Sequence, residues 1–482
     1  MFQSDWKPNK RSSIPVYMQI KEYIRRKIEH GEWTVGSRIP TQRELAKAFG
    51  VNRSTVVTAI DELVAEGLLE GKGRKGTFVI NNSWSLLSSR RPPNWHSYVQ
   101  AGLYRPNQWT IQQINRLEFQ REIIRLGTGE LTPELFPKRR MERILQQLMR
   151  RMDSWGYEEP KGLLFLREQI SQYLRSFGIV ASPHSILIVS GALQALQLIS
   201  LGLLKHGSTL LVERPSYLHS LHLFQSLQMK LRSLPMDEEG VIVKGLPELK
   251  RNDHATLLYT IPSFHNPTGI LMSSERRRDL LEVCEKIQLP LVEDDVYREL
   301  WLDESAPPPI KANDKNGLVL YLGSMSKILS PGLRIGWVVG PEAVIERLAD
   351  IKMQVDYGSS SLSQWVVAKW LESGEHIPYT EEVRSELRKR REIALEILEK
   401  EFSDLGIWNQ PKGGFYIWLR LFSDISMKKL FEEALRQNIL LNPGYLYDPF
   451  ESNTLRISYG YASLTELITG LRRLAILIRK AC

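Results

Sequence analysis

The sequence predicts two domains of different fold class, a small α+β head and a larger α/β body. The 482 residues exceed what one hydrophobic core usually serves. Residues 1–80 carry short helical patterns followed by two short strands, whereas from residue 95 to residue 482 short apolar runs alternate with helical patterns. Between these parts, residues 81–94 are polar and proline-bearing without clear periodicity, which indicates a linker.

Positive charge is concentrated in the head. The chain has a formal net charge of +9, and residues 1–80 hold 14 Lys and Arg against 9 Asp and Glu, a net of +5. The other 402 residues together have a net of +4. Such density is typical of a nucleic-acid contact, although a solvated basic surface would give the same count. The sequence pattern must therefore decide between these interpretations.

Composition argues against several other classes of protein. The longest apolar stretch, residues 186–204, contains Ser, Gly and Gln residues that would be costly in a bilayer, so no membrane span is expected. The N-terminus lacks the charged start and apolar core of a secretory signal. Cys284 and Cys482 have no metal-ligand spacing, which predicts a reducing cytoplasm and neither a disulfide framework nor a metal site.

Two helices are expected to open the head. Apolar residues recur at helical spacing over residues 17–28, which predicts the first helix. Thr41 and Glu44 have the spacing of a capping box, in which each satisfies a free backbone amide of the other, so a second helix should begin there. Gly50 should end it, because glycine readily takes the left-handed conformation that closes a helix.

A third helix should begin at Asn52 and run to Gly67, with Arg53, Ser54 and Thr55 exposed in its first turn. A DNA recognition helix requires this arrangement, because its N-terminal turn enters the major groove. There an arginine can fork onto a guanine edge, and hydroxyls reach bases or phosphates. The inward face of the helix is expected to consist of Val56, Ile60, Leu63 and Val64.

A wing is expected after the third helix. Two short strands, residues 68–70 and 77–80, flank a glycine-rich cationic turn. The glycines let the backbone approach a duplex, and Lys72, Arg74 and Lys75 can neutralise phosphates. Together with the helices, the wing predicts a winged helix-turn-helix. A winged helix used only for protein contacts is the alternative, and the helices, wing and charge together favour DNA binding.

The head resembles the GntR family of bacterial regulators over nearly its whole length. The resemblance rests on residues 36–46 (GSRIPTQRELA), 53–56 (RSTV) and 76–79 (GTFV). It implies a winged helix-turn-helix that binds double-stranded operator DNA. By this resemblance, the DNA contacts are Arg43, Arg53, Ser54 and Thr55, with Arg74 in the wing.

In the body, polar motifs follow short apolar runs that are expected to be strands. The runs are residues 186–189, 209–212, 257–260, 289–292 and 318–322. Because ligand sites in such folds lie at the carboxyl ends of parallel strands, the motifs should gather in one pocket. The motifs are Ser190-Gly191-Ala192, Pro215-Ser216-Tyr217, Asn266-Pro267-Thr268-Gly269, Asp294-Asp295-Val296-Tyr297 and Ser324-Met325-Ser326-Lys327.

These motifs resemble those of the class I aminotransferases of fold type I, over most of the body. The resemblance implies pyridoxal 5'-phosphate as cofactor. Lys327 would hold the cofactor aldehyde as an imine and, once a substrate amine displaces it, would move a proton. Asp294 would keep the pyridine nitrogen protonated, which makes the ring an electron sink. Tyr297 and Asn266 would hydrogen-bond the phenolic oxygen of the ring, and Tyr217 would stack on the ring face.

The same resemblance implies how the cofactor phosphate and a ligand carboxylate are bound. Tyr157 matches the tyrosine that reaches the phosphate of the neighbouring subunit, which implies a dimer. Arg456 matches the arginine that forks onto a substrate α-carboxylate. The phosphate would be bound by Ser324, Arg334 and the backbone amides of Gly191, Ala192 and Leu193, where a helix N-terminus favours an anion.

A GntR-like head followed by an aminotransferase-like body is the plan of the MocR subfamily of transcriptional regulators, which the chain resembles over its full length. The resemblance implies that the cofactor, or an amino compound that reacts with it at Lys327, shifts the body between states. The head would then engage paired operator half-sites differently. Members of this subfamily commonly form head-to-tail homodimers.

Two other functions stay open at this point. Asp294, Lys327 and Arg456 are all present, so a working aminotransferase with an appended DNA-binding head is the main alternative. A pure cofactor sensor is disfavoured, because Arg456 would then have no carboxylate to bind. Regulation is favoured over turnover, because a recognition helix and a wing have no use in transamination. The sequence identifies neither the effector nor the target genes, nor whether transcription is activated or repressed.

Overall fold

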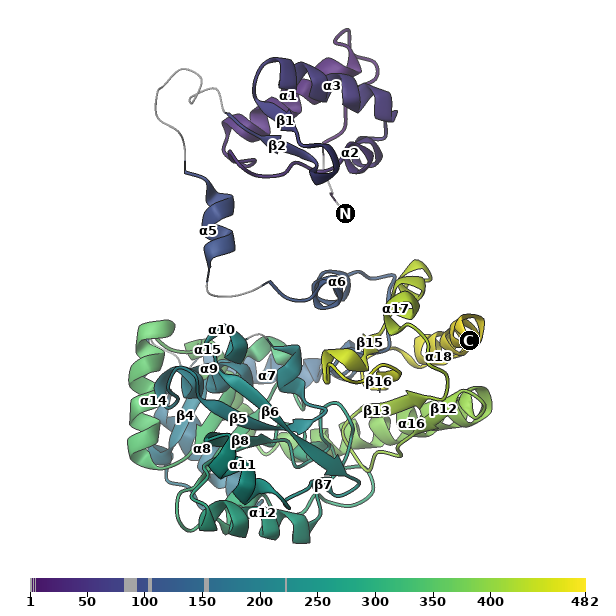
Figure 1. The fold of residues 1–482 in the computed structure, drawn as a ribbon. Coiled ribbons are helices and arrows are strands. Elements are labelled where there is room, and N and C mark those ends of the chain that lie inside the picture. The colour runs from purple at the N-terminus through teal and green to yellow at the C-terminus, as the bar shows by residue number, and fades with distance from the viewer. Residues whose placement is uncertain are drawn as a thin grey trace. The chain divides into compact units, whose positions relative to one another are not determined.

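The computed structural model describes residues 2, 4, 6–81, 93–102, 106–150, 156–221 and 223–482. The chain divides into two compact units, Met1–Leu103 and Tyr104–Cys482 (Figure 1). Residues 82–92, which make up most of the expected linker, lie outside the described residues. Within the described ranges, no helix is long and apolar enough to cross a membrane.

The head is built on three helices, and local signals define their ends. At the second helix the predicted capping box is present: the Glu44 amide donates to Thr41 Oγ1, and the Thr41 amide donates to Glu44 Oε2 at 3.0 Å. Gly50 closes that helix in the left-handed conformation, with φ of 66°. The helices are α1 (Val16–Glu29), α2 (Gln42–Phe49) and α3 (Arg53–Ala65).

The inward face of α3 differs from the prediction at one position. Val56, Ile60 and Leu63 are buried as expected, together with Ala59, but Val64 is 39% exposed. Two steps of four residues carry Val64 about 80° round the helix from Val56, beyond the width of the buried stripe. The prediction for Val64 was therefore wrong.

The wing completes an α+β winged helix-turn-helix. β1 (Leu69–Gly71) pairs antiparallel with β2 (Thr77–Val79), and a short 3₁₀ turn joins them. Gly76 has a φ of 103°, and a Cβ there would lie 2.5 Å from Nε of Arg38, so this turn requires glycine. A further helix, α5 (Trp95–Ala101), is grouped with this first unit.

The body contains an eight-stranded sheet in the order β4-β11-β10-β9-β8-β5-β6-β7 (Figure 1). The central strands β10, β9, β8, β5 and β6 are parallel, whereas β11 and β7 are antiparallel to their neighbours. The strands are β4 (Ile186–Val189), β5 (Thr209–Arg214), β6 (Lys230–Asp237), β7 (Gly240–Val241), β8 (Ala255–Thr260), β9 (Leu291–Asp294), β10 (Val319–Ser324) and β11 (Gly336–Val339).

Successive residues of the central strands face opposite sides of this sheet. Leu211, Leu258 and Leu291 join one hydrophobic cluster, to which α12 (Ser274–Lys286) contributes, while Tyr259 and Val292 join the main core of the body. Because side chains alternate along a strand, Asp294 at the end of β9 faces the same side as Tyr259. The strand periodicity thus brings these two polar side chains to one face.

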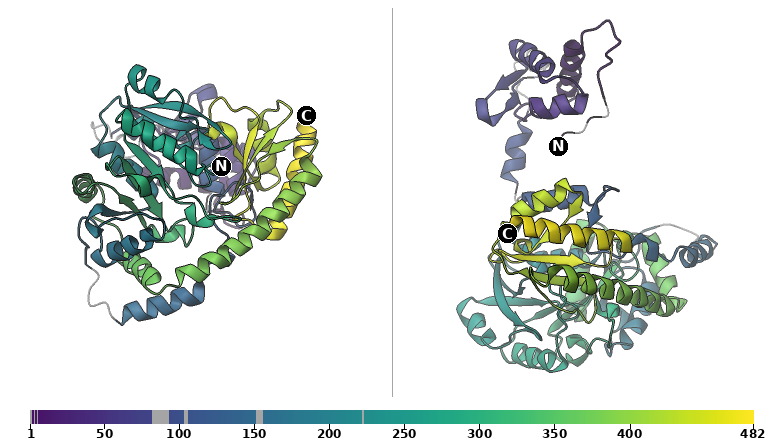
Figure 2. Two further views of the ribbon diagram at one scale, coloured as in Figure 1. Left: turned by 90° about the horizontal axis from the view of Figure 1, so that it is seen from below. Right: turned by 90° about the vertical axis from the view of Figure 1, so that its right-hand side faces the viewer.

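A smaller antiparallel sheet, in the order β12-β13-β16-β15, forms the rest of the body. Helices α16 (His376–Phe402) and α18 (Leu464–Ala481) lie side by side along it (Figure 2). A separate parallel pair, β3 (Ile124–Arg125) with β14 (Ile439–Leu440), joins the beginning of the body to its C-terminal part. The strands of the smaller sheet are β12 (Gly406–Trp408), β13 (Tyr416–Leu421), β15 (Asn442–Pro443) and β16 (Thr454–Ser458).

The other helices of the body surround the two sheets (Figure 1). They are α6 (Trp109–Leu117), α7 (Lys138–Met149), α8 (Leu164–Arg175), α9 (Ala192–Gly202), α10 (Leu223–Ser226), α11 (Leu246–Asn252), α12 (Ser274–Lys286), α13 (Ile310–Asn313), α14 (Glu342–Val355), α15 (Ser361–Glu372) and α17 (Met427–Arg436).

Candidate functional site

The first turn of α3 presents the side chains that the sequence predicts to contact DNA. Arg53 and Ser54 are exposed, and Thr55 is half-buried. Arg53 Nη2 donates to Gln42 Oε1 at 2.9 Å, which holds the guanidinium near the start of α2. Because Gln42 is neutral, Arg53 keeps its full charge for a phosphate or a base edge. Arg43, also on α2, is exposed.

The wing carries less free charge than its sequence suggests. Lys72 Nζ forms an ion pair with Glu70 Oε2 at 3.1 Å, and both side chains are half exposed. Surface pairs of this kind are weak and exchange readily for a phosphate. Lys75 is exposed. Arg74 contributes its backbone to the turn, and its side chain lies outside the described residues.

Arg53→Ala should weaken binding to the promoter duplex about tenfold or more, because a bidentate arginine contact to a base edge contributes ~1–3 kcal/mol. Fluorescence anisotropy with promoter and scrambled duplexes measures this. Lys72→Ala is the control, because loss of a phosphate contact should weaken both duplexes equally. Unchanged affinity and specificity of Arg53→Ala would contradict its role in the recognition helix.

A cavity of about 820 Å³ lies where the parallel strands of the body end. Asp294 ends β9 and Ser324 ends β10, while Asn266 follows β8 and Tyr217 follows β5. The topology therefore brings together motifs that are far apart in the sequence. The predicted residues that line the cavity are Gly191, Ala192, Leu193, Tyr217, Asn266, Asp294, Tyr297, Ser324, Lys327, Arg334 and Arg456.

Lys327 and Tyr297 lie next to each other in this cavity. Lys327 Nζ donates to the Gly129 carbonyl at 2.7 Å and lies 5.9 Å from the centroid of the Tyr297 ring. Asn266 Nδ2 donates to the Tyr297 hydroxyl at 3.3 Å. Burial raises the pKa of Tyr297 well above its ordinary value, so this hydroxyl stays protonated at neutral pH. The pair thus supplies an amine and a phenol to the same space.

Asp294 is a buried carboxylate with one free oxygen. Its Oδ2 accepts a hydrogen bond from the Tyr259 hydroxyl at 2.7 Å. Its Oδ1 is buried without a hydrogen-bond partner among the described residues. Burial raises the pKa of Asp294 to about 6, although the Tyr259 hydrogen bond and the charge of Lys327 act in the other direction. A buried acceptor of this kind is costly unless a ligand donates to it.

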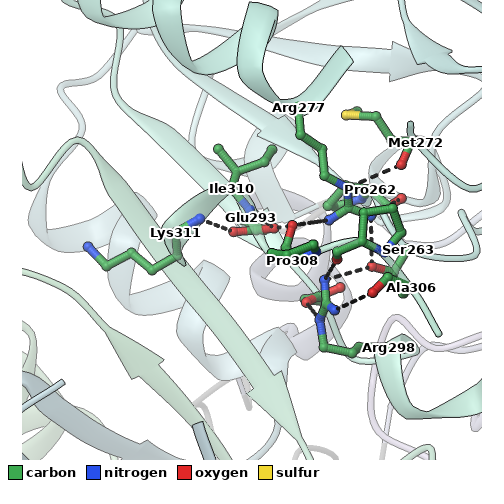
Figure 3. Close-up of polar contacts among 12 residues, drawn as sticks. Pro262, Ser263, Met272, Arg277, Glu293, Arg298, Ala306, Pro308, Ile310 and Lys311 are labelled. Carbon is green, nitrogen blue, oxygen red and sulfur yellow. Dashed lines mark hydrogen bonds and ion pairs between the residues drawn. The ribbon is translucent and has the colours of Figure 1, made fainter. Parts of the chain in front are cut away.

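Buried ionic contacts hold Glu293 and Asp295, the two neighbours of Asp294 in the sequence, and Figure 3 shows those of Glu293. Glu293 accepts hydrogen bonds from two backbone amides at the start of α13, each at 2.8 Å. Arg277 lies 3.7 Å from Glu293 and donates to the Pro262 carbonyl at 2.9 Å. Asp295 accepts a hydrogen bond from Arg298. Because both flanking carboxylates are held in this way, the end of β9 is fixed and Asp294 with it.

Arg456 lies between two tyrosine rings in the same cavity. Its guanidinium carbon is 4.3 Å from the ring centroid of Tyr416 and 4.9 Å from that of Tyr447. Nη1 donates to Asn266 Oδ1 at 2.7 Å, and Nη2 donates to the Gly127 carbonyl at 2.6 Å. Nε is buried without a partner among the described residues. A planar guanidinium in this position suits a carboxylate.

Groups suited to binding an anion lie where α9 begins. Gly191 precedes the helix with a φ of 81°, and a Cβ there would lie 2.7 Å from Nη2 of Arg334. Arg334 Nη2 donates to the Ser190 carbonyl at 2.6 Å, which keeps the guanidinium beside the helix N-terminus. Ser324 Oγ accepts from the Ser326 amide at 3.1 Å and lies at the same cavity. The amides of Ala192 and Leu193, a cation and a hydroxyl converge there, as anion binding requires, whereas the Gly191 amide already donates to the Val189 carbonyl at 2.9 Å.

Tyr157 does not line the cavity of its own chain. It is 83% exposed, and its ring packs against Tyr357 with centroids 4.9 Å apart. Its assignment to the phosphate of a neighbouring subunit stays a prediction.

Comparison with known proteins identifies both parts of the chain. The model of the family "Aminotransferase class I and II" matches residues 121–471, and that of "Bacterial regulatory proteins, gntR family" matches residues 16–79. The uncharacterized HTH-type transcriptional regulators YdfD and YisV of Bacillus subtilis (strain 168) are 53% and 51% identical. The alignments cover 98% of this chain and 98% of YdfD, and 100% of this chain and 99% of YisV.

The chain belongs to the MocR-type regulators, in which a GntR helix-turn-helix domain is fused to a class I aminotransferase domain. It is an HTH-type transcriptional regulator with an aminotransferase-like domain. The crystal structure of a kynurenine aminotransferase from Pyrococcus horikoshii has a TM-score of 0.74 and 33% identity, and the match covers 78% of this chain and 95% of the other. The body therefore has the aminotransferase fold that the sequence predicted.

Several residues in or beside the cavity of this MocR-type chain were not found from its sequence. Tyr259 lies within a predicted strand, but its contact with Asp294 depends on β8 and β9 being neighbours in a particular register. Gly129 meets Lys327 only because the segment after β3 turns back to the cavity. The aromatic residues Tyr416 and Tyr447 carry no motif of their own, and alternation along β13 would have identified only the first.

In the cofactor-free MocR-type protein, Asp294→Asn should raise the melting temperature at pH 7. The pKa of Asp294 is about 6 in the folded chain against 3.8 ordinarily, so folding disfavours its ionised form by ~3 kcal/mol above about pH 6. Below about pH 4 the carboxyl is protonated in both folded and unfolded chains, and this cost disappears. Thermal unfolding at several pH values should therefore show a stability difference that grows as pH rises from about 4 to 6. A difference independent of pH would contradict the buried, ionised carboxylate.

Proposed function

We propose that this regulator binds operator DNA through its winged helix, binds pyridoxal 5'-phosphate in its body, and senses an amino compound there. One observation carries the cofactor proposal: Asp294 keeps a buried, unpartnered oxygen in a cavity that also contains Lys327. An unpartnered buried acceptor next to an amine fits a ligand with a ring N–H and an aldehyde. The related kynurenine aminotransferase was solved in complex with PMP, which supports a ligand of this class.

The polar groups of the cavity fit each end of this cofactor. When bound, the cofactor supplies an aldehyde that condenses with amines and a ring that withdraws electrons. Asp294 Oδ1 would accept a hydrogen bond from the protonated ring nitrogen, and Lys327 would present the amine. Tyr297 and Asn266 would donate to the phenolic oxygen, and Tyr217 would cover the ring face.

The phosphate would lie at the start of α9. Ser324, Arg334 and the first amides of the helix would bind it, because together they supply a hydroxyl, a permanent cation and free N–H groups. Tyr157 would contribute from the other subunit of a head-to-tail homodimer. Its high exposure supports this, because a tyrosine that serves a partner has no reason to be buried in its own chain.

Arg456 indicates that the sensed amino compound carries a carboxylate. Its guanidinium is enclosed by tyrosine rings and by Asn266, and its Nε lacks a partner. A buried arginine with unsatisfied hydrogen-bonding capacity binds carboxylates well, because its fork geometry matches theirs. The carboxylate at Arg456 and the amine near Lys327 would orient an amino acid across the cavity.

The connection to the head would run through α6. This helix is the first element of the body, and Ile111 and Ile114 on it line the cavity. A ligand that contacts α6 would therefore act on the segment that continues into the head. Regulation requires that the ligand bind one arrangement of this segment better than another, since equal affinity shifts no equilibrium.

Lys327→Ala should abolish the visible absorption band of the bound cofactor, because no amine would remain at that position to condense with the aldehyde. The cofactor should also be lost on gel filtration, whereas the wild-type protein should retain it. Absorption spectra before and after filtration measure both effects. A retained band in the variant would show that another group holds the cofactor.

A working aminotransferase is the second candidate function, because Lys327, Asp294 and Arg456 line one cavity as turnover would require. A panel of amino acids should be added to the cofactor-loaded protein while the absorption band, promoter binding and keto-acid formation are followed. We expect one compound to shift the band and change promoter binding without accumulation of product. Product formed over many turnovers, with unchanged DNA affinity, would favour the enzyme.

A further inference from the structure

One corner of the cavity is acidic and uncompensated. Glu118, at the C-terminal cap of α6, and Glu130, after β3, both line the cavity together with Lys327. Neither carboxylate has a cationic nitrogen within ion-pair distance in the described part of the chain. Elsewhere the cavity is lined by two cations, Arg334 and Arg456, and by the carboxylate of Asp294. Arginines bind anions and carboxylates do not, so Glu118 and Glu130 have no part in binding a phosphate or an α-carboxylate.

The position of Glu118 is electrostatically unfavourable in the ligand-free chain. A carboxylate at the C-terminal end of a helix opposes the helix dipole. Burial raises the pKa of Glu118, and the charge of Glu130 raises it further, whereas Arg125 and Lys327 lower it. Arg125 does not neutralise it by contact, because its guanidinium stacks 4.5 Å above the ring of Tyr461. A bound cation would remove these costs.

Glu118 is held at the cavity by the packing of α6. Thr110 Oγ1 lies 2.9 Å from the Tyr445 hydroxyl, and the Trp109 ring packs edge-on against Phe431 with centroids 6.0 Å apart. Ile114 is partly buried against the core of the body. The carboxylate is thus presented by an anchored helix.

An independent observation indicates that this corner accepts a ligand. Thr128 lines the same cavity and is only 7% exposed. Its Oγ1 has no hydrogen-bond partner among the described residues. Thr128 is two residues from Glu130, so an unsatisfied buried hydroxyl lies close to the acidic corner. A ligand that carries hydrogen-bond donors would satisfy the Thr128 hydroxyl and the two carboxylates.

We propose that the sensed compound is an amino acid whose side chain carries a second cationic group, and that Glu118, with Glu130, binds this distal group. The inference rests on the proposed function, because Arg456 and Lys327 must orient the α-carboxylate and α-amine of the same molecule. An amino acid with an apolar side chain would leave the charges of Glu118 and Glu130 uncompensated. An amino acid with an acidic side chain would be repelled by them. Specificity would thus come from α6, which adjoins the segment leading to the head.

The test is a titration of the cofactor-loaded, full-length protein with L-lysine and with L-norleucine, followed by the absorption band. These amino acids have side chains of the same length in carbon, and only lysine carries the distal ammonium. We expect lysine to act at a concentration about tenfold lower, because it adds a charge-assisted hydrogen bond that norleucine cannot make. L-2-Aminoadipate, which carries a distal carboxylate, should be the weakest of the three.

Glu118→Gln should weaken the binding of lysine until the midpoint of the lysine titration approaches that of norleucine. Glu130→Gln should do the same to a smaller degree, and it tests the proposal if the first variant fails to fold. Glu122→Gln is the matched control, because Glu122 is exposed just beyond α6 and does not line the cavity. This control should keep the wild-type preference.

Two results would overturn the inference, and they differ in what else they overturn. Equal midpoints for lysine and norleucine, or a lysine preference that survives in both Glu118→Gln and Glu130→Gln, would refute the role of the acidic corner and leave the proposed sensing intact. If none of the three amino acids nor any other in the panel changes the band, the sensing of amino compounds fails, and this inference fails with it.

Discussion

The buried carboxylate of Asp294 is the constraint on which the body depends. Burial disfavours the ionised form of Asp294. The fold nevertheless holds this carboxylate in place through the contacts of the residues around it. Tyr259 donates to one oxygen of Asp294, and Arg298 donates to Asp295. Glu293 accepts from backbone amides and lies beside Arg277 (Figure 3). The second oxygen is left free toward the cavity. Such an arrangement costs stability in the empty protein and is repaid when a ligand donates to that oxygen.

Local signals in the sequence were enough to predict the head. The capping box at Thr41 and the closing Gly50 each act within a few residues, so they could be interpreted without knowledge of the fold. The exposure of Val64 could not be predicted in this way, because the width of the buried stripe on α3 depends on what packs against the helix. Tertiary packing, rather than any local signal, therefore decides which side chains of α3 are buried.

In the body, the sequence predicted the polar residues that end strands. It missed side chains whose positions depend on how strands and helices pack against one another. Asp294 and Ser324 follow apolar runs, and parallel topology alone brings them together. Tyr259 depends on strand register, and Glu118 depends on how α6 packs against the body. Tyr259 lowers the pKa that burial raises at Asp294, and Glu118, in our proposal, determines the specificity of the cavity. The chemistry was therefore more predictable from sequence than the ligand.

The central claim is that ligand binding in the body and DNA binding by the head are linked, and linkage is reciprocal. The most direct measurement is a titration of the cofactor-loaded protein with the amino compound that changes its absorption band most, without and with saturating promoter duplex. The account predicts that DNA shifts the midpoint by the same factor by which the compound shifts DNA affinity. Identical midpoints, with both ligands bound, would contradict it.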